Sequence, residues 1–187
     1  MNIADLIAQE QQLARPCALL KRAGSADQLA GVWAGDGVVS VNGGPYRHWL
    51  SIDCRFLPPD LGPREGVLSI YTNEDDCESG VTAFGADARI PHLSAQPIYA
   101  HPSISFPPPD ALAGGDDERY LRYWQTVCPM YTGDAVAVLG GWHFPWPDGD
   151  WEELRNHSLI AWTLDESEPW VEVWKTPNGY RVMQRIT

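Results

Sequence analysis

The sequence lacks any apolar run long enough to cross a lipid bilayer. Its longest apolar stretch, residues 135–142, is interrupted by glycines and falls well short of the roughly 20 residues that a spanning helix needs. The first twelve residues also lack the basic start and apolar centre of a secretory signal. We therefore expect a soluble, cytoplasmic protein that does not associate with membranes.

Positive charge is scarce. The chain carries 13 Lys and Arg residues against 25 Asp and Glu residues, a formal net charge of −12. A surface this acidic repels nucleic acid and anionic lipid. The composition therefore predicts no nucleic-acid binding, and it favours either a basic protein partner or a small neutral or cationic ligand.

Several motifs that carry chemistry are missing. The four cysteines, Cys17, Cys54, Cys77 and Cys128, form no C-x-x-C pair, and the histidines have no metal-ligand spacing. The sequence contains no G-x-S-x-G elbow, no H-E-x-x-H helix, no phosphate-binding lysine loop and no dinucleotide fingerprint. We therefore expect no metal and no cofactor, and reduced thiols.

What is present indicates a folded chain. Hydrophobic residues make up 44% of the 187 positions, and nine residues are tryptophans. The pattern predicts one α+β domain over residues 1–187. Apolar spacing predicts an amphipathic helix over 3–14, and Pro16 either ends or kinks it or begins a second short helix through Leu20. A central helix is predicted over 116–128, closed by Pro129.

Period-two alternation predicts a mainly antiparallel sheet. In the first strand, His48, Leu50 and Cys54 are expected on one face. The last three strands are expected to form a meander, with a tight turn at 176–179. The predicted strands are 46–57, 66–72, 135–143, 157–165, 170–175 and 180–187.

A Pro- and Gly-rich stretch at about 85–116 is predicted to be a long, ordered surface loop. Only a short strand near Ile104 is expected within it. Loops of this length in compact domains are often functional, so the stretch is a secondary candidate site.

The strongest candidate site follows the buried strand that ends near Gly140 and Gly141. Tryptophan presents a large flat face and one N–H donor at low entropic cost. The segment can therefore form a binding platform, or its aromatics can simply cover the edge of the core. Its aromatic and imidazole side chains are Trp142, His143, Phe144, Trp146 and Trp151.

A second candidate is Glu172. Alternation places it on one face with Trp170 and Trp174, and it places two valines on the core face. A covered carboxylate needs a partner, for which Arg181 and Arg185 are candidates. Alternatively, Glu172 lines a pocket shared with the Trp-rich segment.

These patterns favour a non-enzymatic binding protein that uses the Trp-rich segment as its contact surface. The alternative is a hydrolase-type enzyme in which His143 acts with the nearby carboxylates of Asp148 and Asp150. The sequence does not name the ligand or the partner.

The cysteine pattern generates the first prediction. Titration of freshly isolated protein under denaturing, non-reducing conditions is expected to find four free thiols, because no pair has disulfide-framework spacing. Two disulfides would contradict the cytoplasmic assignment.

Overall fold

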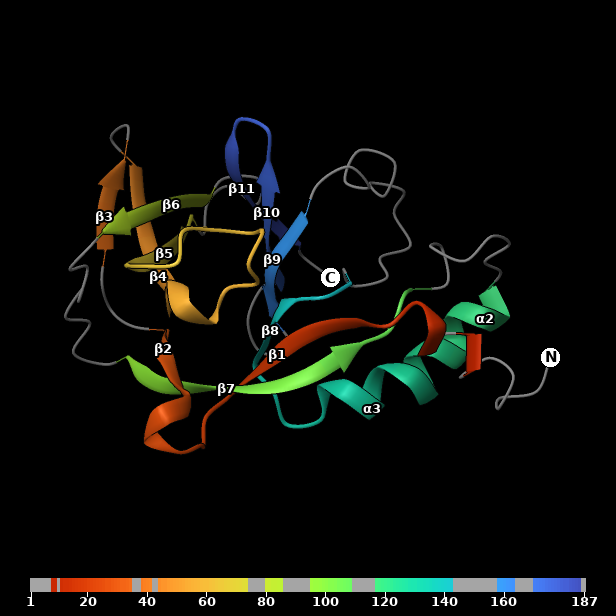
Figure 1. Ribbon diagram of the computed structural model, residues 1–187. Helices are drawn as coiled ribbons and strands as arrows, with labels where there is room; N and C mark the ends of the chain where they lie inside the picture. Colours follow the sequence, from red (N-terminus) through yellow and green to blue (C-terminus); the bar gives the residue numbers. More distant parts are fainter. Residues whose placement is uncertain are drawn as a thin grey trace.

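The computed structural model describes residues 8–9, 11–34, 38–41, 44–73, 80–85, 95–108, 117–142, 158–163 and 170–185. The described residues contain eleven strands, one longer helical segment at 117–132, and two 3-10 turns, η1 (Ala26–Gln28) and η2 (Cys54–Phe56) (Figure 1). The strands are β1 (Arg15–Lys21), β2 (Leu29–Trp33), β3 (Val38–Val41), β4 (Gly44–Asp53), β5 (Val67–Thr72), β6 (Gly80–Gly85), β7 (Gln96–Ser105), β8 (Ala137–Gly140), β9 (Ser158–Thr163), β10 (Trp170–Thr176) and β11 (Gly179–Arg185).

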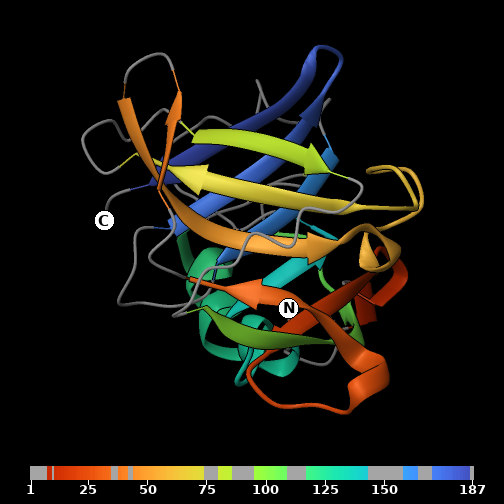
Figure 2. The same ribbon diagram turned by 90° about the vertical axis from the view of Figure 1, so that its left-hand side faces the viewer.

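All the paired strands run antiparallel in a single sheet. Its order is β11-β10-β9-β8-β1-β7-β2-β4-β5-β6, and β3 pairs with the beginning of β4. The two end strands, β6 and β11, also lie against each other. Figure 2 shows how β4, β5 and β6 curve in front of the C-terminal strands. The sheet therefore curls into an incomplete barrel, which protects its edges from unwanted pairing.

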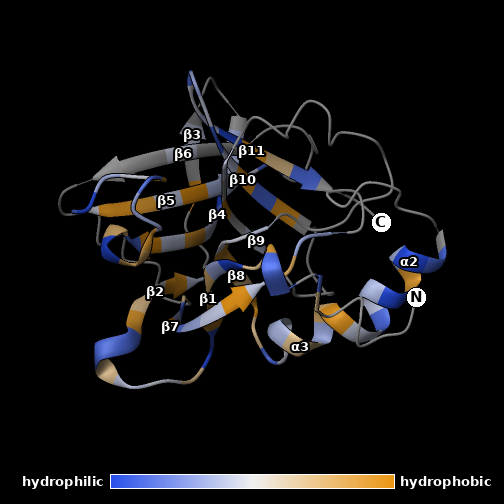
Figure 3. Ribbon diagram, turned by 45° about the vertical axis from the view of Figure 1, so that its right-hand side comes forward, coloured by the Kyte–Doolittle hydropathy of each residue, from blue (hydrophilic) through white to orange (hydrophobic). Residues whose placement is uncertain are grey.

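The inside of the curl is packed with apolar side chains. Strands from every part of the sheet contribute to this cluster, including the fully buried Leu20, Leu50, Leu139 and Val173. Figure 3 shows hydrophobic residues recurring along β4, β5 and β10. The inner face is therefore a filled core, and its burial drives the curling of the sheet.

A second cluster lies on the outer face of β1, β8, β9 and β10. Here the helical segment packs Tyr123, Val127 and Tyr131 against Leu19 and Val138. The hydroxyl groups of Tyr123 and Tyr131 are hydrogen-bonded at 2.8 Å. Burial raises the pKa of Tyr131 well above its ordinary value. Part of the sheet is therefore covered on both faces, which matches the expected combination of helix and mainly antiparallel sheet.

The N-terminal part of the chain departs from the prediction. The helix predicted over 3–14 lies largely outside the described residues, although 8–9 and 11–12 are helical. A short helix from Pro16 through Leu20 is wrong, because these residues belong to strand β1. Cys17 and Leu19 face the outer cluster and Leu20 faces the inner one. Because side chains on both faces of this strand are buried, the sequence shows no alternation of polar and apolar residues that would identify it as a strand.

The loop predicted at about 85–116 is also partly wrong, because it contains the ten-residue strand β7. This strand pairs with β1 over Tyr99–Ser105 and with β2 over Gln96–Tyr99. Among the described strands, Pro102 therefore has a partner on its β1 side alone, and Pro97 on its β2 side alone. A proline with one unpaired side can be accommodated in a strand, because its missing N–H need not interrupt a ladder.

Strand β4 is shorter and less regular than its alternation predicts. Its register with β5 shifts between His48 and Leu50, which turns His48 away from the face that Leu50 shares with the inner core. The strand ends at Asp53, and a 3-10 turn follows over Cys54–Phe56. The side chain of Asp53 caps this turn by accepting the Arg55 N–H at 2.9 Å. The register shift between His48 and Leu50 is a β-bulge, and the hydropathy pattern of the sequence does not reveal where such a bulge occurs.

The central helix continues past its predicted end. It runs as α2 (Asp117–Arg122), a π-helical turn (Tyr123–Val127) and α3 (Cys128–Thr132). In the wider turn, the N–H of Cys128 donates to the carbonyl of Tyr123, five residues back. Pro129 then lies in the first turn of α3, where its missing N–H costs little.

The C-terminal strands lie near their predicted places. Ala137, Val138 and Leu139 have no exposed surface, which confirms the expectation that this strand is buried on both faces. Strand β10 is flanked by β9 and β11, and Thr176 pairs with Gly179 across a two-residue turn.

The two-faced packing generates a prediction on stability. Leu139→Ala is expected to lower the free energy of unfolding by about 2–5 kcal/mol, because it leaves a cavity in the inner core. Leu121→Ala is the matched control, since Leu121 is 55% exposed on α2, and its cost is expected to stay below about 1 kcal/mol. Urea denaturation measures both, and equal costs would contradict the assigned core.

Candidate functional site

The chain leaves strand β8 through two glycines with left-handed backbone. Gly140 has a φ of +69° and Gly141 a φ of +80°, a region that side chains with a Cβ rarely adopt. A Cβ on Gly141 would lie 2.1 Å from Ser105 Oγ, and one on Gly140 would lie 2.5 Å from Pro58 Cγ. Glycine is therefore required here both for the turn and for the close approach of the chain.

The turn carries Trp142 across β1 to β7. Its backbone N–H donates to Ser105 Oγ at 2.8 Å, and Ser105 is the last residue of β7. Its indole N–H donates to the carbonyl oxygen of Leu13 at 2.8 Å. Two hydrogen bonds to two separate segments thus fix both the backbone and the ring of the first residue in the Trp-rich segment.

Arg15 completes this arrangement. The centre of its guanidinium lies 3.5 Å from the centroid of the Trp142 ring, and Arg15 begins strand β1 directly opposite Ser105. Partial burial lowers the pKa of Arg15 from its ordinary value, while the negative face of the indole attracts the cation. We define Leu13, Arg15, Ser105 and Trp142 as the Trp142 clasp.

Most of the predicted site lies outside the described residues. This holds for His143, Phe144, Trp146 and Trp151, and for the carboxylates of Asp148 and Asp150. Of the residues proposed from the sequence, the structure describes Trp142 and Glu172. Trp142 is partly exposed, whereas Glu172 is 1% exposed.

Glu172 is held within the sheet. Val171 and Val173 belong to the inner core, while Glu172 and Trp174 are buried on the other side of β10, as the alternation predicted. The indole N–H of Trp174 donates to Glu172 Oε2 at 3.1 Å. The residue opposite on β11 is Met183, and Arg181 and Arg185 lie two positions away from it on either side, opposite Trp174 and Trp170.

The two described site residues come from different parts of the sheet. Glu172 lies on β10, which is separated from β8 by β9, whereas Trp142 crosses β1 on the opposite side of β8. Burial among indoles makes Glu172 a component of the packed outer face. Of these two residues, Trp142 is the one that is partly exposed.

A buried polar cluster was not anticipated from the sequence. His48 Nε2 and Ser51 Oγ are 2.8 Å apart, and Ser51 Oγ is 2.8 Å from Ser69 Oγ. Burial raises the pKa of Tyr71, and a hydrogen bond with Ser69 opposes the rise. Residues three apart on a regular strand point to opposite faces, so only the bulge in β4 brings His48 to Ser51.

The spacing of His48 and Ser51 is that of a base and a nucleophile. Both side chains are nearly fully buried, however, at 4% and 5% exposure. Buried hydroxyl and imidazole groups need hydrogen-bond partners, and this cluster supplies them between β4 and β5 for His48 Nε2 and the hydroxyl groups of Ser51 and Ser69. We therefore interpret the cluster as a structural element.

A shallow pocket of about 250 Å³ lies where β4 ends and β5 begins. Its lining includes Asp53, Arg55, Arg64 and Glu65. Asp53 and Arg55 form an ion pair at 2.7 Å, so part of the pocket's charge is already neutralised. The remaining lining balances one cation against one anion and indicates no particular ligand.

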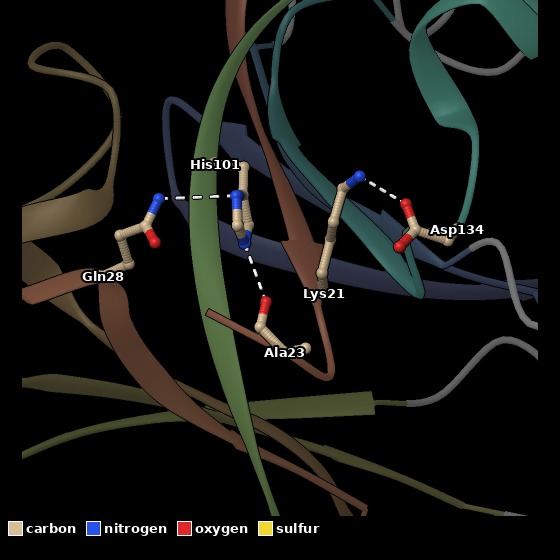
Figure 4. Close-up of polar contacts among 5 residues, drawn as sticks. All are labelled: Lys21, Ala23, Gln28, His101 and Asp134. Carbon is tan, nitrogen blue, oxygen red and sulfur yellow. Dashed lines mark hydrogen bonds and ion pairs between the residues drawn. The ribbon is translucent and has the colours of Figure 1, made fainter. Parts of the chain in front are cut away.

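Another polar cluster joins the end of β1 to its neighbours (Figure 4). Lys21 forms an ion pair with Asp134, which lowers the pKa of that carboxyl. His101 Nε2 lies 2.9 Å from the carbonyl oxygen of Ala23, and Gln28 reaches His101 Nδ1 at 3.4 Å. A neutral imidazole that donates from Nε2 and accepts at Nδ1 satisfies both contacts, so the cluster pins the loop between β1 and β2.

Neither a metal centre nor a membrane span emerges from the described ranges. No group of three or more potential metal-binding side chains occurs among those residues, and no helix there is long and apolar enough to cross a bilayer. Cys17, Cys54 and Cys128 are free and buried. Burial raises the pKa of Cys17 to about 12 and that of Cys128 to about 11, so both thiols stay protonated at neutral pH.

Comparison with protein-family models, with curated proteins and with solved structures finds no match to this chain. Function is therefore inferred from the chemistry of the residues described above.

The clasp generates a prediction on the glycine turn. Gly141→Ala is expected to destabilise the protein more than Gly179→Ala does. Both glycines have positive φ, but nothing lies within 4 Å of a Cβ at Gly179, whereas Ser105 obstructs one at Gly141. The excess cost is expected to be about 1–3 kcal/mol, measured by chemical denaturation. Equal costs would show that the crossing over β1 is loosely packed.

Proposed function

We propose that the chain is a non-enzymatic binding protein whose Trp-rich segment, beginning at Trp142, contacts a basic protein partner. The observation that supports this most strongly is the Trp142 clasp. It fixes the start of the segment on the sheet by two hydrogen bonds and leaves the indole partly exposed. A preorganised aromatic residue loses little entropy on binding, which is why such residues are frequent at the centres of interfaces.

Charge supports a basic partner. The chain has only two lysines, and both make contacts within the fold. Lys21 is paired with Asp134, and Lys175 donates to the carbonyl oxygen of Asp60 at 2.6 Å. The net charge of −12 is what remains after all 13 Lys and Arg residues are counted against the 25 Asp and Glu residues.

Acidic residues are also concentrated in two connections of the chain, one that follows β5 and one that precedes β10, and the end of β5 lies near the start of β10. Four of them connect β5 to β6, and three connect β9 to β10. At the described strand ends, Gln184 Nε2 donates to the carbonyl oxygen of Asn73 at 2.7 Å, and Gln184 pairs with Val171 near the start of β10. The acidic connections contain Glu74, Asp75, Asp76 and Glu78, and Asp165, Glu166 and Glu168.

Charge and aromatic surface would act at different stages of binding. A negative field raises the rate at which a basic partner encounters the protein, and salt weakens that effect. Aromatic contacts then determine how long the complex persists. The proposal therefore assigns long-range attraction to the carboxylates and the close contact to the Trp-rich segment.

In the alternative proposal, the chain is a hydrolase in which His143 acts with the carboxylates of Asp148 and Asp150. In the ranges that the structure describes, the spacing of a nucleophile and base occurs at Ser51 and His48, and these are buried. The described geometry therefore supports binding better than it supports catalysis.

Partner capture tests the proposal. Immobilised full-length protein is expected to retain a basic protein from native cell extract, identified by mass spectrometry, and to release it as salt is raised. Trp146→Ala is expected to reduce the capture at least tenfold while changing the free energy of unfolding by less than about 1 kcal/mol, as surface substitutions do.

Leu121→Ala is the matched control, since it removes an exposed apolar side chain from α2, outside the Trp-rich segment. It is expected to leave capture unchanged. A loss of several kcal/mol of stability in Trp146→Ala would instead make Trp146 part of the core, and the proposed binding surface would be wrong.

A further inference from the structure

The indole N–H of Trp142 already has a hydrogen-bond partner within the chain. Its only polar atom, Nε1, donates to the Leu13 carbonyl at 2.8 Å, so the ring has no donor left for a ligand. The exposed part of the side chain is therefore aromatic surface. Such a surface binds cations and apolar groups.

Arg15 already uses this surface in the way that a cationic ligand would. Its guanidinium lies 3.5 Å from the ring centroid, and the side chain is exposed. Contacts of this kind at exposed sites are weak and readily exchanged. The aromatic face of Trp142 therefore already binds a cation, and that cation is the guanidinium of Arg15 in the same chain.

The surroundings suit a long basic side chain. The carbonyl oxygen of Leu13 accepts the indole hydrogen bond, and the Leu13 residue is 45% exposed. Lysine and arginine stems pack on apolar surface while their charged ends reach a polar or aromatic group.

We propose that Arg15 is an intramolecular placeholder on Trp142, which an arginine or lysine side chain of the basic partner displaces when it binds. This inference rests on the proposed binding function and adds the chemistry that the clasp recognises. It makes the Arg15–Trp142 contact autoinhibitory: removing Arg15 opens the acceptor, while the hydrogen bonds to Leu13 and Ser105 keep the indole in place.

The experiment uses the full chain labelled with ¹⁵N and N-acetylarginine amide as the probe. The indole N–H signal of Trp142 is assigned by its loss in Trp142→Phe. In Arg15→Gln, the apparent affinity of the probe at this signal is expected to rise about threefold over the unsubstituted protein, the factor that corresponds to a weak exposed cation–π contact.

Arg64→Gln is the matched control, because it changes the net charge equally at the shallow pocket near β5. It is expected to keep the affinity of the unsubstituted protein. Equal affinities in Arg15→Gln and Arg64→Gln would overturn the proposal, as would a shift shared equally by all the indole signals.

If Arg15→Gln loses the dispersed spectrum of a folded protein, Arg15→Lys takes its place. An ammonium group makes a weaker contact with the ring than a guanidinium, so a smaller gain in affinity is expected. No gain in Arg15→Lys would overturn the proposal in that case.

The result is independent of partner capture. If Trp146→Ala abolishes capture but the probe behaves identically in all variants, the placeholder role is wrong and the binding function stands. If capture is insensitive to Trp146→Ala, the proposed function fails whatever the probe shows.

Discussion

The structure depends on burying strands β1 and β8 from both sides at once. Leu20 and Leu139 face the filled interior of the curled sheet, while Leu19 and Val138 face the helical segment on the outside. Neither face alone would remove these strands from water, so the curl of the sheet and the docking of the helix are required together. The Tyr123–Tyr131 hydrogen bond satisfies hydroxyl groups that this packing removes from solvent.

The same constraint positions the candidate site. The chain leaves β8 through Gly140 and Gly141 in left-handed conformation, and both glycines pack too closely against Pro58 and Ser105 to admit a Cβ. That turn directs Trp142 across β1 to the end of β7, where Ser105 receives its N–H. The position of Trp142 therefore follows from the packing of the sheet, and its partly exposed indole donates its N–H to the carbonyl oxygen of Leu13.

Prediction from the sequence succeeded where burial leaves a clear pattern. The apolar residues of β8 and the valines of β10 were recognised, because such residues report which faces are covered. It failed where neighbours compensate for a locally unfavourable residue. Strand β7 was taken for a loop because of its prolines, which can be accommodated because each has one unpaired side among the described strands. Pro129 likewise reads as a helix end, although a π-helical turn carries the helix through it.

The sequence by itself determined the acidic charge and the mixed composition of sheet and helix, since these depend on residue types and local periodicity, and it predicted a site around Trp142. Only the tertiary structure decided that Arg15 lies over that indole, that Leu13 accepts its N–H, and that Glu172 is enclosed in the outer face of β10. Arg15 and Trp142 are joined by strands that pair across more than a hundred residues of chain. Contacts between such distant positions follow from strand order, and no local pattern encodes strand order.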